Sequence, residues 1–204
     1  MRLLDSVGPN PKVVRMFIAE RGITGIPLQT IDLRGGENRQ APYLAKNPTG
    51  QCPTLELDDG SYLTEITAIC EYLDETSLGT SLIGATPQER AETRMWTRRI
   101  DLAIVEPMTA GFRYAEGLKF FTPRMRCIPQ AADDLKTLAK EKLAWLEGQI
   151  AGRTFICGDR LTLADILLFA FLQFAATVRQ PLDPANTNLT AWYDRMAARP
   201  SAAA

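Results

Sequence analysis

The residues best suited to chemistry are gathered in one run, NPTGQCPTLELDDGSYLTEIT, at positions 47–67. It holds a turn, a Cys52-Pro53 step, two short strand-like segments around Asp59-Gly60, and Glu65 at the head of a helical pattern. The backbone before Pro53 can pair with an extended peptide, and the Glu65 carboxylate can hold an ammonium group. Free N–H groups at a helix start can hold a carboxylate. One ligand that carries an ammonium, a carboxylate and a peptide backbone would use all three groups.

Histidine is absent from the chain, and its four cysteines form no CxxC pair. This composition argues against most zinc sites and every histidine-based triad, so no metal is expected. Scattered thiols without a secretion signal are typical of a reducing compartment, and we expect a cytoplasmic protein. Catalysis would then depend on hydroxyls, amides, thiols, carboxylates or a bound cosubstrate.

The bulk properties are those of an ordinary folded protein with enough apolar residues for a core. Apolar residues make up 46% of the 204 positions, and the net charge is −1. This charge gives no case for nucleic acid or an anionic membrane as a partner. The longest apolar run, 166–178, is too short to span a membrane, which needs about 20 residues. It predicts a helix buried at the centre of a helical domain.

The first 77 residues predict a small α+β domain. Asn10 is expected to cap a helix with Pro11 at its first position, and Gly22 to close that helix. Strands are predicted near Leu3-Leu4, over 27–33, and as a hairpin over 54–57 and 62–63, with helices over 41–46 and 66–75. The order βαβ followed by ββα predicts a thioredoxin-like domain over residues 1–77.

The rest of the chain predicts a linker over 78–87 and an all-α bundle over 88–204. Helical patterns run over 88–116, 124–150, 162–178 and 187–198. Thr162 and Asp165 form a variant capping box, with Leu161 and Ile166 as the hydrophobic staple. We expect this motif to nucleate the central helix and to carry no chemistry.

These segments resemble the cytosolic glutathione S-transferase family. In that family Asn-Pro-x-Gly-x-Val-Pro-x-Leu precedes Asp-Gly and then Glu-Ser-x-Ala-Ile-x-x-Tyr-Leu, which is similar to residues 47–73 here. Gly158–Asp165 and Trp192–Pro200 are similar to later family segments. The resemblance implies glutathione as cosubstrate, a homodimer, and a thioredoxin-like domain followed by a helical one. The N-terminal site looks like that of bacterial members with nu-like or phi-like features.

Several binding residues are implied by this resemblance. The bond before Pro53 should be cis, so that the Cys52 backbone pairs with the cysteinyl part of glutathione; a plain turn proline is the alternative. Glu65 should bind the γ-glutamyl ammonium, unless it is only a solvated charge at a helix start. Ile66 stands where the family has Ser, but its backbone N–H remains available. Thr67, one residue on, could supply the missing hydroxyl.

Gln51 and Arg39 match family positions beside the peptide and the glycyl carboxylate. A guanidinium suits a carboxylate through two parallel N–H bonds, although Arg39 could equally be a solvated charge on a polar connection. Cys52 stands where Val or Ile is usual. A small buried residue is the preferred interpretation of Cys52, ahead of a redox thiol.

Two residues are candidates to stabilise the glutathione thiolate. The family places Ser, Tyr or Cys at the start of the first helix, and Asn10 occupies this position, with Ser6 four residues earlier. Lowering a thiol pKa requires hydrogen-bond donors and a helix N-terminus near the sulfur. The Asn10 amide can donate, and its alternative role is the helix cap. Nu-like members also have Asn here and favour glutathione-disulfide chemistry.

The second substrate is expected to contact Phe112, Arg113 and Tyr114, although ordinary bundle packing is an equal alternative for Phe112. The predicted function is a glutathione transferase whose bound thiolate attacks a hydrophobic electrophile. Glutathione-dependent disulfide reduction is one alternative. A non-catalytic scaffold that binds partner proteins is another, favoured by Ile66 and by the lack of a hydroxyl at position 10.

Overall fold

The computed structural model describes residues 1–204 and confirms the α+β class, with a thioredoxin-like domain followed by a helical one. The chain divides into two compact units, which are Met1–Ala85 with Pro200–Ala204, and Thr86–Arg199. The last five residues thus belong to the first unit, whereas the sequence placed them with the second domain. None of the helices combines the length and the hydropathy needed to cross a membrane.

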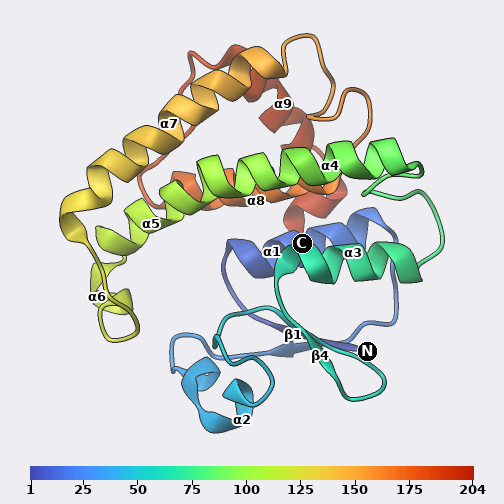
Figure 1. Ribbon diagram of the computed structural model, residues 1–204, viewed down its shortest axis with the longest axis vertical. Coiled ribbons are helices and arrows are strands. Elements are labelled where there is room, and N and C mark those ends of the chain that lie inside the picture. Colours follow the sequence, from blue (N-terminus) through green and yellow to red (C-terminus); the bar gives the residue numbers. More distant parts are fainter. The chain divides into compact units, whose positions relative to one another are not determined.

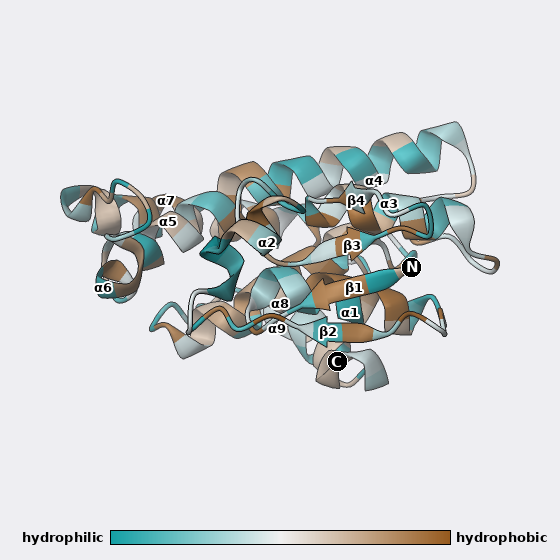
Figure 2. Ribbon diagram, turned by 90° about the horizontal axis from the view of Figure 1, so that it is seen from below, coloured by the Kyte–Doolittle hydropathy of each residue, from teal (hydrophilic) through white to brown (hydrophobic).

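The first unit is built on a four-stranded sheet in the order β2-β1-β3-β4. Strand β1 (Arg2–Asp5) pairs in parallel with β2 (Leu28–Thr30) and antiparallel with β3 (Thr54–Glu56), which pairs antiparallel with β4 (Tyr62–Leu63). The central strands bury Leu3, Leu4 and Leu55 completely, and the middle of β1 is coloured as hydrophobic in Figure 2. The expected hairpin is therefore confirmed, while the strand expected over 27–33 is shorter.

Helices cover both faces of this sheet (Figure 1). Helices α1 (Pro9–Glu20) and α3 (Ile66–Thr76) lie side by side on one face, where Phe17, Ile69 and Leu73 are fully buried. The 3₁₀ turn η1 (Glu37–Arg39) and the short helix α2 (Ala41–Leu44) lie on the opposite side.

The start of α1 differs from the prediction. The helix begins at Pro9, and Gly8 is the N-cap residue with φ +116°, so Asn10 lies inside the first turn and is not the cap. Proline is tolerated at both positions 9 and 11, because first-turn N–H groups have no helical partner to lose. Only glycine adopts the Gly8 backbone angle readily. The cap interpretation of Asn10 is wrong, and its amide does not bond the helix start.

A buried ion pair fastens the end of α1 to the end of α3. The Arg21 Nε lies 3.0 Å from the Asp74 Oδ1, and only 1% of the Arg21 side chain is exposed. The guanidinium also donates to three backbone carbonyls, those of Asp74, Ser77 and Thr80. Asp74 accepts from the backbone N–H of Leu82 at 2.9 Å. One cation therefore joins the end of α1 to the stretch 74–80, more than 50 positions later in the sequence.

The C-terminal 3₁₀ turn η4 (Pro200–Ala203) packs on α1. Lys12 donates its Nζ to the Ala202 carbonyl at 2.7 Å, and the Ser201 hydroxyl donates to Glu20. Ser201 and Ala202 are buried. Both ends of α1 are therefore tied to the last residues of the chain.

The second unit is all helical, as predicted. Helix α4 (Pro87–Ile100) continues through a π-helical turn, η2 (Asp101–Val105), into α5 (Glu106–Tyr114). Helices α7 (Ala132–Gln149), α8 (Leu163–Thr177) and α9 (Thr187–Ala197) follow. Helix α8 is buried along nearly its whole length, which confirms it as the central helix.

The segment between α5 and α7 corrects the helix expected over 124–150. It holds a short helix α6 (Leu118–Phe121) and a 3₁₀ turn η3 (Pro129–Ala131), and α7 begins only at residue 132. Ile128 has φ −125° and ψ 76°. A residue that precedes proline is driven out of the helical region, so Pro129 prevents the earlier start.

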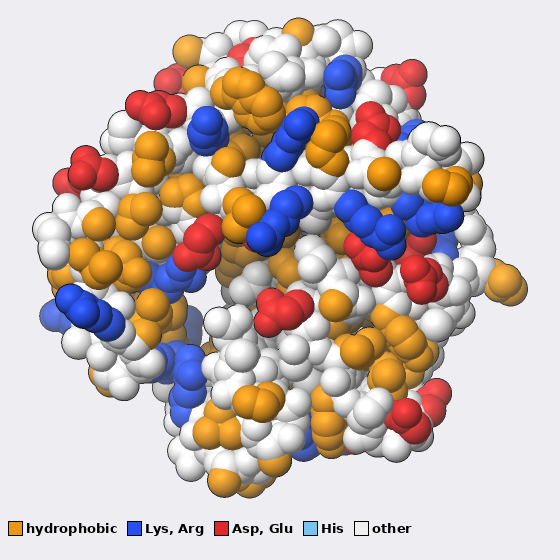
Figure 3. All heavy atoms as spheres, viewed as in Figure 1, with side chains coloured by type: hydrophobic (Ala, Val, Ile, Leu, Met, Phe, Trp, Pro, Cys, Tyr) orange, Lys and Arg blue, Asp and Glu red, His pale blue; other side chains and the backbone are white.

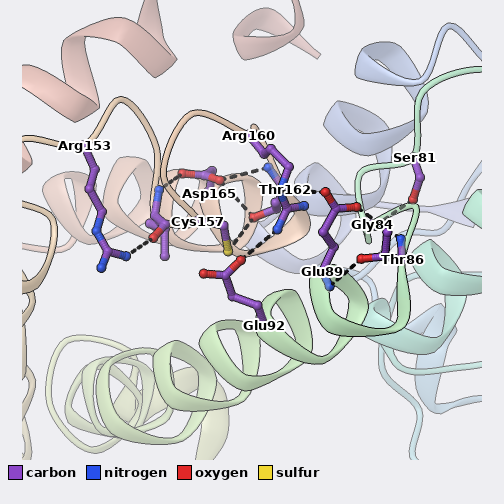
Figure 4. A network of polar contacts seen from close by, with 11 residues as sticks. Ser81, Gly84, Thr86, Glu89, Glu92, Arg153, Cys157, Arg160, Thr162 and Asp165 are labelled. Atoms are coloured by element: carbon purple, nitrogen blue, oxygen red, sulfur yellow. Dashed lines mark hydrogen bonds and ion pairs between the residues drawn. The ribbon is translucent and has the colours of Figure 1, made fainter.

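The predicted capping box precedes α8. The Asp165 carboxylate, fully buried, accepts from the backbone N–H and the hydroxyl of Thr162, from the Ile156 N–H, and from the Trp192 indole at 2.9 Å. Figure 4 shows this cluster beside Arg160, whose guanidinium lies 2.9 Å from Glu92 on α4. The motif thus joins α8, α9 and the loop before α8, which is a structural role.

Candidate functional site

Strand pairing brings three of the predicted segments to one edge of the sheet. Leu55 is paired with Leu63, so two residues further along each strand Pro53 lies opposite Glu65. Leu4 is paired with Thr54, so the same extension places Ser6 opposite Cys52. The end of β1, the Cys52-Pro53 step and the start of α3 therefore meet within the first unit.

The Cys52-Pro53 peptide bond is cis, as the resemblance implied. None of the backbone hydrogen bonds of the surrounding loop uses the N–H or the carbonyl of Cys52. The Cys52 side chain is buried in a small core with Leu4, Ile31 and Tyr43. This residue therefore has a backbone free to pair with a peptide and a thiol that points into the protein.

Glu65 is exposed directly before α3, with the left-handed backbone angle φ +67°. Such an angle is uncommon for a residue other than glycine and costs about 1–3 kcal/mol, and such residues gather at functional sites. No side chain caps α3, and its first turn contains no acidic residue. The helix start therefore presents unpaired N–H groups next to one free carboxylate.

Ile66 and Thr67 open α3 and are both half-buried. The helical hydrogen bonds at this end begin with the Ile69 N–H, which donates to the Glu65 carbonyl at 3.0 Å. The N–H groups of residues 66–68 have no helical partner. The Thr67 hydroxyl makes no hydrogen bond within the chain, so it remains available to a ligand.

The turn that precedes Cys52 holds Arg39 against Thr49 and Gly50, directly before Gln51 in the sequence. The Arg39 guanidinium donates to the Thr49 carbonyl at 3.2 Å, and both Arg39 and Gln51 are exposed. Gly50, between them in space, has φ +62° and lies against the backbone of Asn38. The tight turn therefore sets Arg39 beside the Gln51 segment.

The two candidate thiolate donors differ in what their side chains already do. The Ser6 hydroxyl is buried and donates to the Ile31 carbonyl at 2.6 Å. Its single proton is thus used by the fold. Asn10 is half-buried in the first turn of α1, and its amide makes no hydrogen bond within the chain. The contacts favour Asn10 as the donor.

Tyr43 and Asn47 lie directly behind this site, and the sequence analysis gave them no role. The Tyr43 hydroxyl contacts the Gln51 carbonyl at 2.6 Å, and the Asn47 amide donates to the same carbonyl at 2.8 Å. A buried tyrosine close in sequence to an Asn-Pro turn is a weak signal, because most buried tyrosines serve packing.

Residues 112–114 do not share one surface. Phe112 packs edge-to-face on Phe174, with ring centroids 5.0 Å apart, and this supports the packing interpretation. Arg113 is paired with Glu106. Only Tyr114 lines an open groove of about 570 Å³ between α5 and α7, together with mostly apolar residues such as Pro107 and Leu135.

The structure contains no group of three or more His, Cys, Asp or Glu residues that could hold a metal ion.

Comparison with known proteins identifies the family. Residues 7–76 match "Glutathione S-transferase, N-terminal domain", and residues 118–200 match "Glutathione S-transferase, C-terminal domain". The chain belongs to the glutathione S-transferase family, whose members use glutathione as cosubstrate.

Three relatives show how far the similarity extends. Glutathione S-transferase 2 of Saccharomyces cerevisiae is 34% identical over 198 residues, which is 95% of this chain and 84% of that protein. A glutathione S-transferase domain-containing protein of Marinobacter aquaeolei VT8 has a crystal structure with TM-score 0.93 and 38% identity, covering 98% and 99% of the two chains. Elongation factor 1-gamma of Danio rerio is 32% identical over 163 residues, 78% of this chain but only 34% of its own length.

Proposed function

We propose that the first unit binds glutathione along the edge where β1, the Cys52-Pro53 step and α3 meet. Glu65 holds the γ-glutamyl ammonium, while the N–H groups of Ile66 and its successors, with the Thr67 hydroxyl, hold the γ-glutamyl carboxylate. The cysteinyl backbone pairs with Cys52. Arg39 and Gln51 reach the glycyl end.

The observation that carries this proposal is the conformation of Glu65. Its left-handed backbone places an exposed carboxylate next to the unpaired N–H groups of α3. A carboxylate and a ring of N–H donors side by side complement the ammonium and carboxylate of one α-amino acid. The strand register then places Pro53 opposite Glu65, at the distance between two paired strands.

The bound thiol is proposed to react as a thiolate held beside Asn10. A free thiol titrates near pH ~8.5, and both the Asn10 amide and the dipole of α1 favour the negative charge. The sulfur forms a bond to the electrophilic atom, whose leaving group departs with the bonding electron pair. The enzyme contributes proximity and a higher fraction of thiolate.

Calorimetric titration with glutathione tests the binding site. Glu65→Gln should weaken binding about tenfold or more, because a charge-assisted hydrogen bond is worth about 1.5–3 kcal/mol. Glu75→Gln, an exposed change at the other end of α3, should leave the affinity unchanged. Equal affinities for both variants would contradict the proposed role of Glu65.

Two alternative functions each have an observation in their favour. Glutathione-dependent disulfide reduction is favoured by Asn10, since nu-like relatives with this residue have that activity. A scaffold role is favoured by Ile66 and by the similarity to part of elongation factor 1-gamma. Turnover of an aryl halide compared with turnover of a small disulfide separates the two reactions, and wild-type protein that binds no glutathione would favour the scaffold.

We also propose that the chain forms a homodimer, as is typical of the family. The second unit exposes Met95 and Leu102 on its first long helix and Leu138 and Trp145 on α7. Figure 3 shows hydrophobic side chains among Lys and Arg on the face that carries α4 and α7. Sedimentation equilibrium should give twice the chain mass of 22.6 kDa, and a monomer at micromolar concentration would contradict the proposal.

A further inference from the structure

Behind the proposed glutathione site lies a buried group of polar side chains centred on Tyr43. Its hydroxyl lies 2.6 Å from the Gln51 carbonyl, 3.1 Å from the Cys52 sulfur and 3.0 Å from the Thr54 hydroxyl. Asn47 donates to the Gln51 carbonyl at 2.8 Å and to the Thr54 hydroxyl at 3.2 Å. Tyr43 is only 3% exposed and Thr54 is fully buried.

The chemistry of these groups fixes the direction of every hydrogen bond around Tyr43. The Gln51 carbonyl can only accept, so it receives the single Tyr43 proton. The two lone pairs of the Tyr43 oxygen then accept from the Cys52 thiol and the Thr54 hydroxyl. Thr54 in turn accepts from Asn47. All hydroxyl and thiol protons are thereby used.

This arrangement requires a neutral phenol and a neutral thiol, and burial provides both. Burial raises the pKa of Tyr43 far above its usual value. Burial likewise raises the pKa of the Cys52 thiol. Both groups therefore keep their protons throughout the physiological range.

The consequence for the site comes from the planarity of the peptide bond. Among the peptide bonds only Cys52-Pro53 is cis, so the Gln51-Cys52 bond is trans, and its C=O and N–H point in opposite directions. Two donors hold the Gln51 carbonyl toward the interior. The Cys52 N–H, in the same plane, is thereby directed away from the interior.

We propose that Tyr43, assisted by Asn47, is a positioning residue for glutathione binding: it fixes the Gln51-Cys52 peptide plane and so directs the Cys52 N–H at the cysteinyl carbonyl of the ligand. This inference rests on the proposed function, since it assigns a role within that site. Tyr43 itself touches no ligand and acts only through the peptide plane.

Comparing two ligands separates positioning from general stability. The first ligand is glutathione, and the second is an analogue in which an (E)-alkene replaces the cysteinyl-glycine peptide bond and removes the carbonyl acceptor. Calorimetry with wild-type protein should show tighter binding of glutathione. In Tyr43→Phe the affinity for glutathione should fall about three- to tenfold, the range of one hydrogen bond, while that for the analogue stays within about twofold.

Thr54→Val is the matched control, because it removes a buried hydroxyl from the same group but leaves both donors to the Gln51 carbonyl. This variant should lower thermal stability about as much as Tyr43→Phe does. It should keep the wild-type ratio of the affinity for glutathione to the affinity for the analogue.

Two outcomes for Tyr43→Phe would overturn the inference: unchanged affinity for both ligands, or an equal loss for both. If Thr54→Val reduces the ratio of the affinity for glutathione to that for the analogue as strongly as Tyr43→Phe does, the inference is also overturned. The effect of Tyr43→Phe would then be a general structural one. Wild-type protein that binds neither ligand would instead refute the proposed function, and the inference with it.

Discussion

Cys52 shows how one residue serves the site through its backbone alone. Its thiol is buried and hydrogen-bonded to Tyr43, and burial raises the pKa of this thiol as it does for Cys70 and Cys157, the last to about 11. A protonated buried thiol is a poor nucleophile. At this site the reactive sulfur is therefore expected to be the one that the ligand brings.

Asn10 is expected to control the ionisation of that sulfur. Asn10→Ala removes an amide donor that makes no hydrogen bond within the chain, so the pKa of bound glutathione should rise by about 1 unit, or about 1.4 kcal/mol. Transferase activity should fall at neutral pH and recover as the pH rises through the new pKa. The ultraviolet absorbance of the bound thiolate, titrated against pH, measures the shift.

Ser6→Ala provides the comparison, because the Ser6 hydroxyl already donates to the Ile31 carbonyl. This variant should lose some stability and keep the wild-type thiolate titration. If it shifts the titration while Asn10→Ala does not, the two assignments must be exchanged.

The resemblance of residues 47–73 to the family pattern was enough to suggest roles for positions 51–53 and 65. The hydrogen-bond partners of these residues could not be predicted from the sequence. Tyr43 and Asn47 act on the Gln51 carbonyl from eight and four positions away, and only the folded turn brings them there.

Among the elements, the turn that ends in Gly50 tolerates no side chain. A Cβ at Gly50 would lie 2.8 Å from the Asn38 carbonyl and 3.0 Å from the Arg39 guanidinium, at a φ of +62°. Gly50→Ala should therefore displace the segment that leads to Gln51, with losses in both glutathione affinity and stability. Calorimetry and denaturant unfolding measure the two effects.

Gly60→Ala isolates the backbone contribution to that result. Gly60 has φ +83°, and a Cβ there would meet nothing within 4 Å. The Gly60→Ala variant should lose about 1–2 kcal/mol in the free energy of unfolding, which is the penalty of the left-handed region alone. Its affinity for glutathione should not change. Similar losses in the two variants would mean that the contact with Asn38 is unimportant.

Helix α9 depends on a carboxylate from another helix. Glu147 on α7 accepts from the backbone N–H groups of Asn188 and Leu189, each at 2.8 Å, and from the Asn188 amide at 2.7 Å. Partial burial raises the pKa of Glu147, but these donors outweigh it and hold the pKa below its usual value. The ionised form is thus favoured by folding.

The stability that Glu147 contributes should therefore be present above its unfolded pKa of about 4.3 and be lost as the pH falls through its lower folded value. Glu147→Gln should unfold more easily at neutral pH and lose part of the acid dependence of the wild type. Denaturant unfolding at several pH values measures this, with the exposed Glu141→Gln on the same helix as control. An unchanged acid dependence in Glu147→Gln would contradict the assignment.

Element prediction succeeded where the signals are local. The Asp59-Gly60 hairpin and α3 carry their own turn and helix-start residues, and both lie where expected. The start of α1 was misplaced because Pro9 and Pro11 are both acceptable first-turn residues, and the choice depended on the backbone angle of Gly8. The π turn at 101–105 has no local signal.

At the scale of the whole molecule, the Arg21–Asp74 pair holds the first unit together. Replacing Arg21 with Met leaves Asp74 buried without its cation, which should cost about 3–5 kcal/mol in the free energy of unfolding. Arg2→Met is the control, since the Arg2–Glu56 pair is more exposed and should be worth about 0–1 kcal/mol. Denaturant unfolding compares them, and equal losses would contradict the assigned role of the buried pair.

The division into a sheet domain and a helical domain could be predicted from the sequence patterns alone, because strand patterns stop near residue 76 and helical patterns follow. The place of the final five residues did not follow, since Pro-Ser-Ala-Ala carries no signal of its own. Its contacts are made with side chains on α1, more than 180 positions earlier.

The position of that last segment has a consequence for how the protein comes into being. A ribosome releases the sheet and its helices early, yet the patch of α1 around Lys12 and Glu20 stays uncovered until residues 201 and 202 are translated. The part of the molecule that is made first is thus completed only after more than 180 further residues have been made, and during synthesis it must persist, or be sheltered, in an unfinished form.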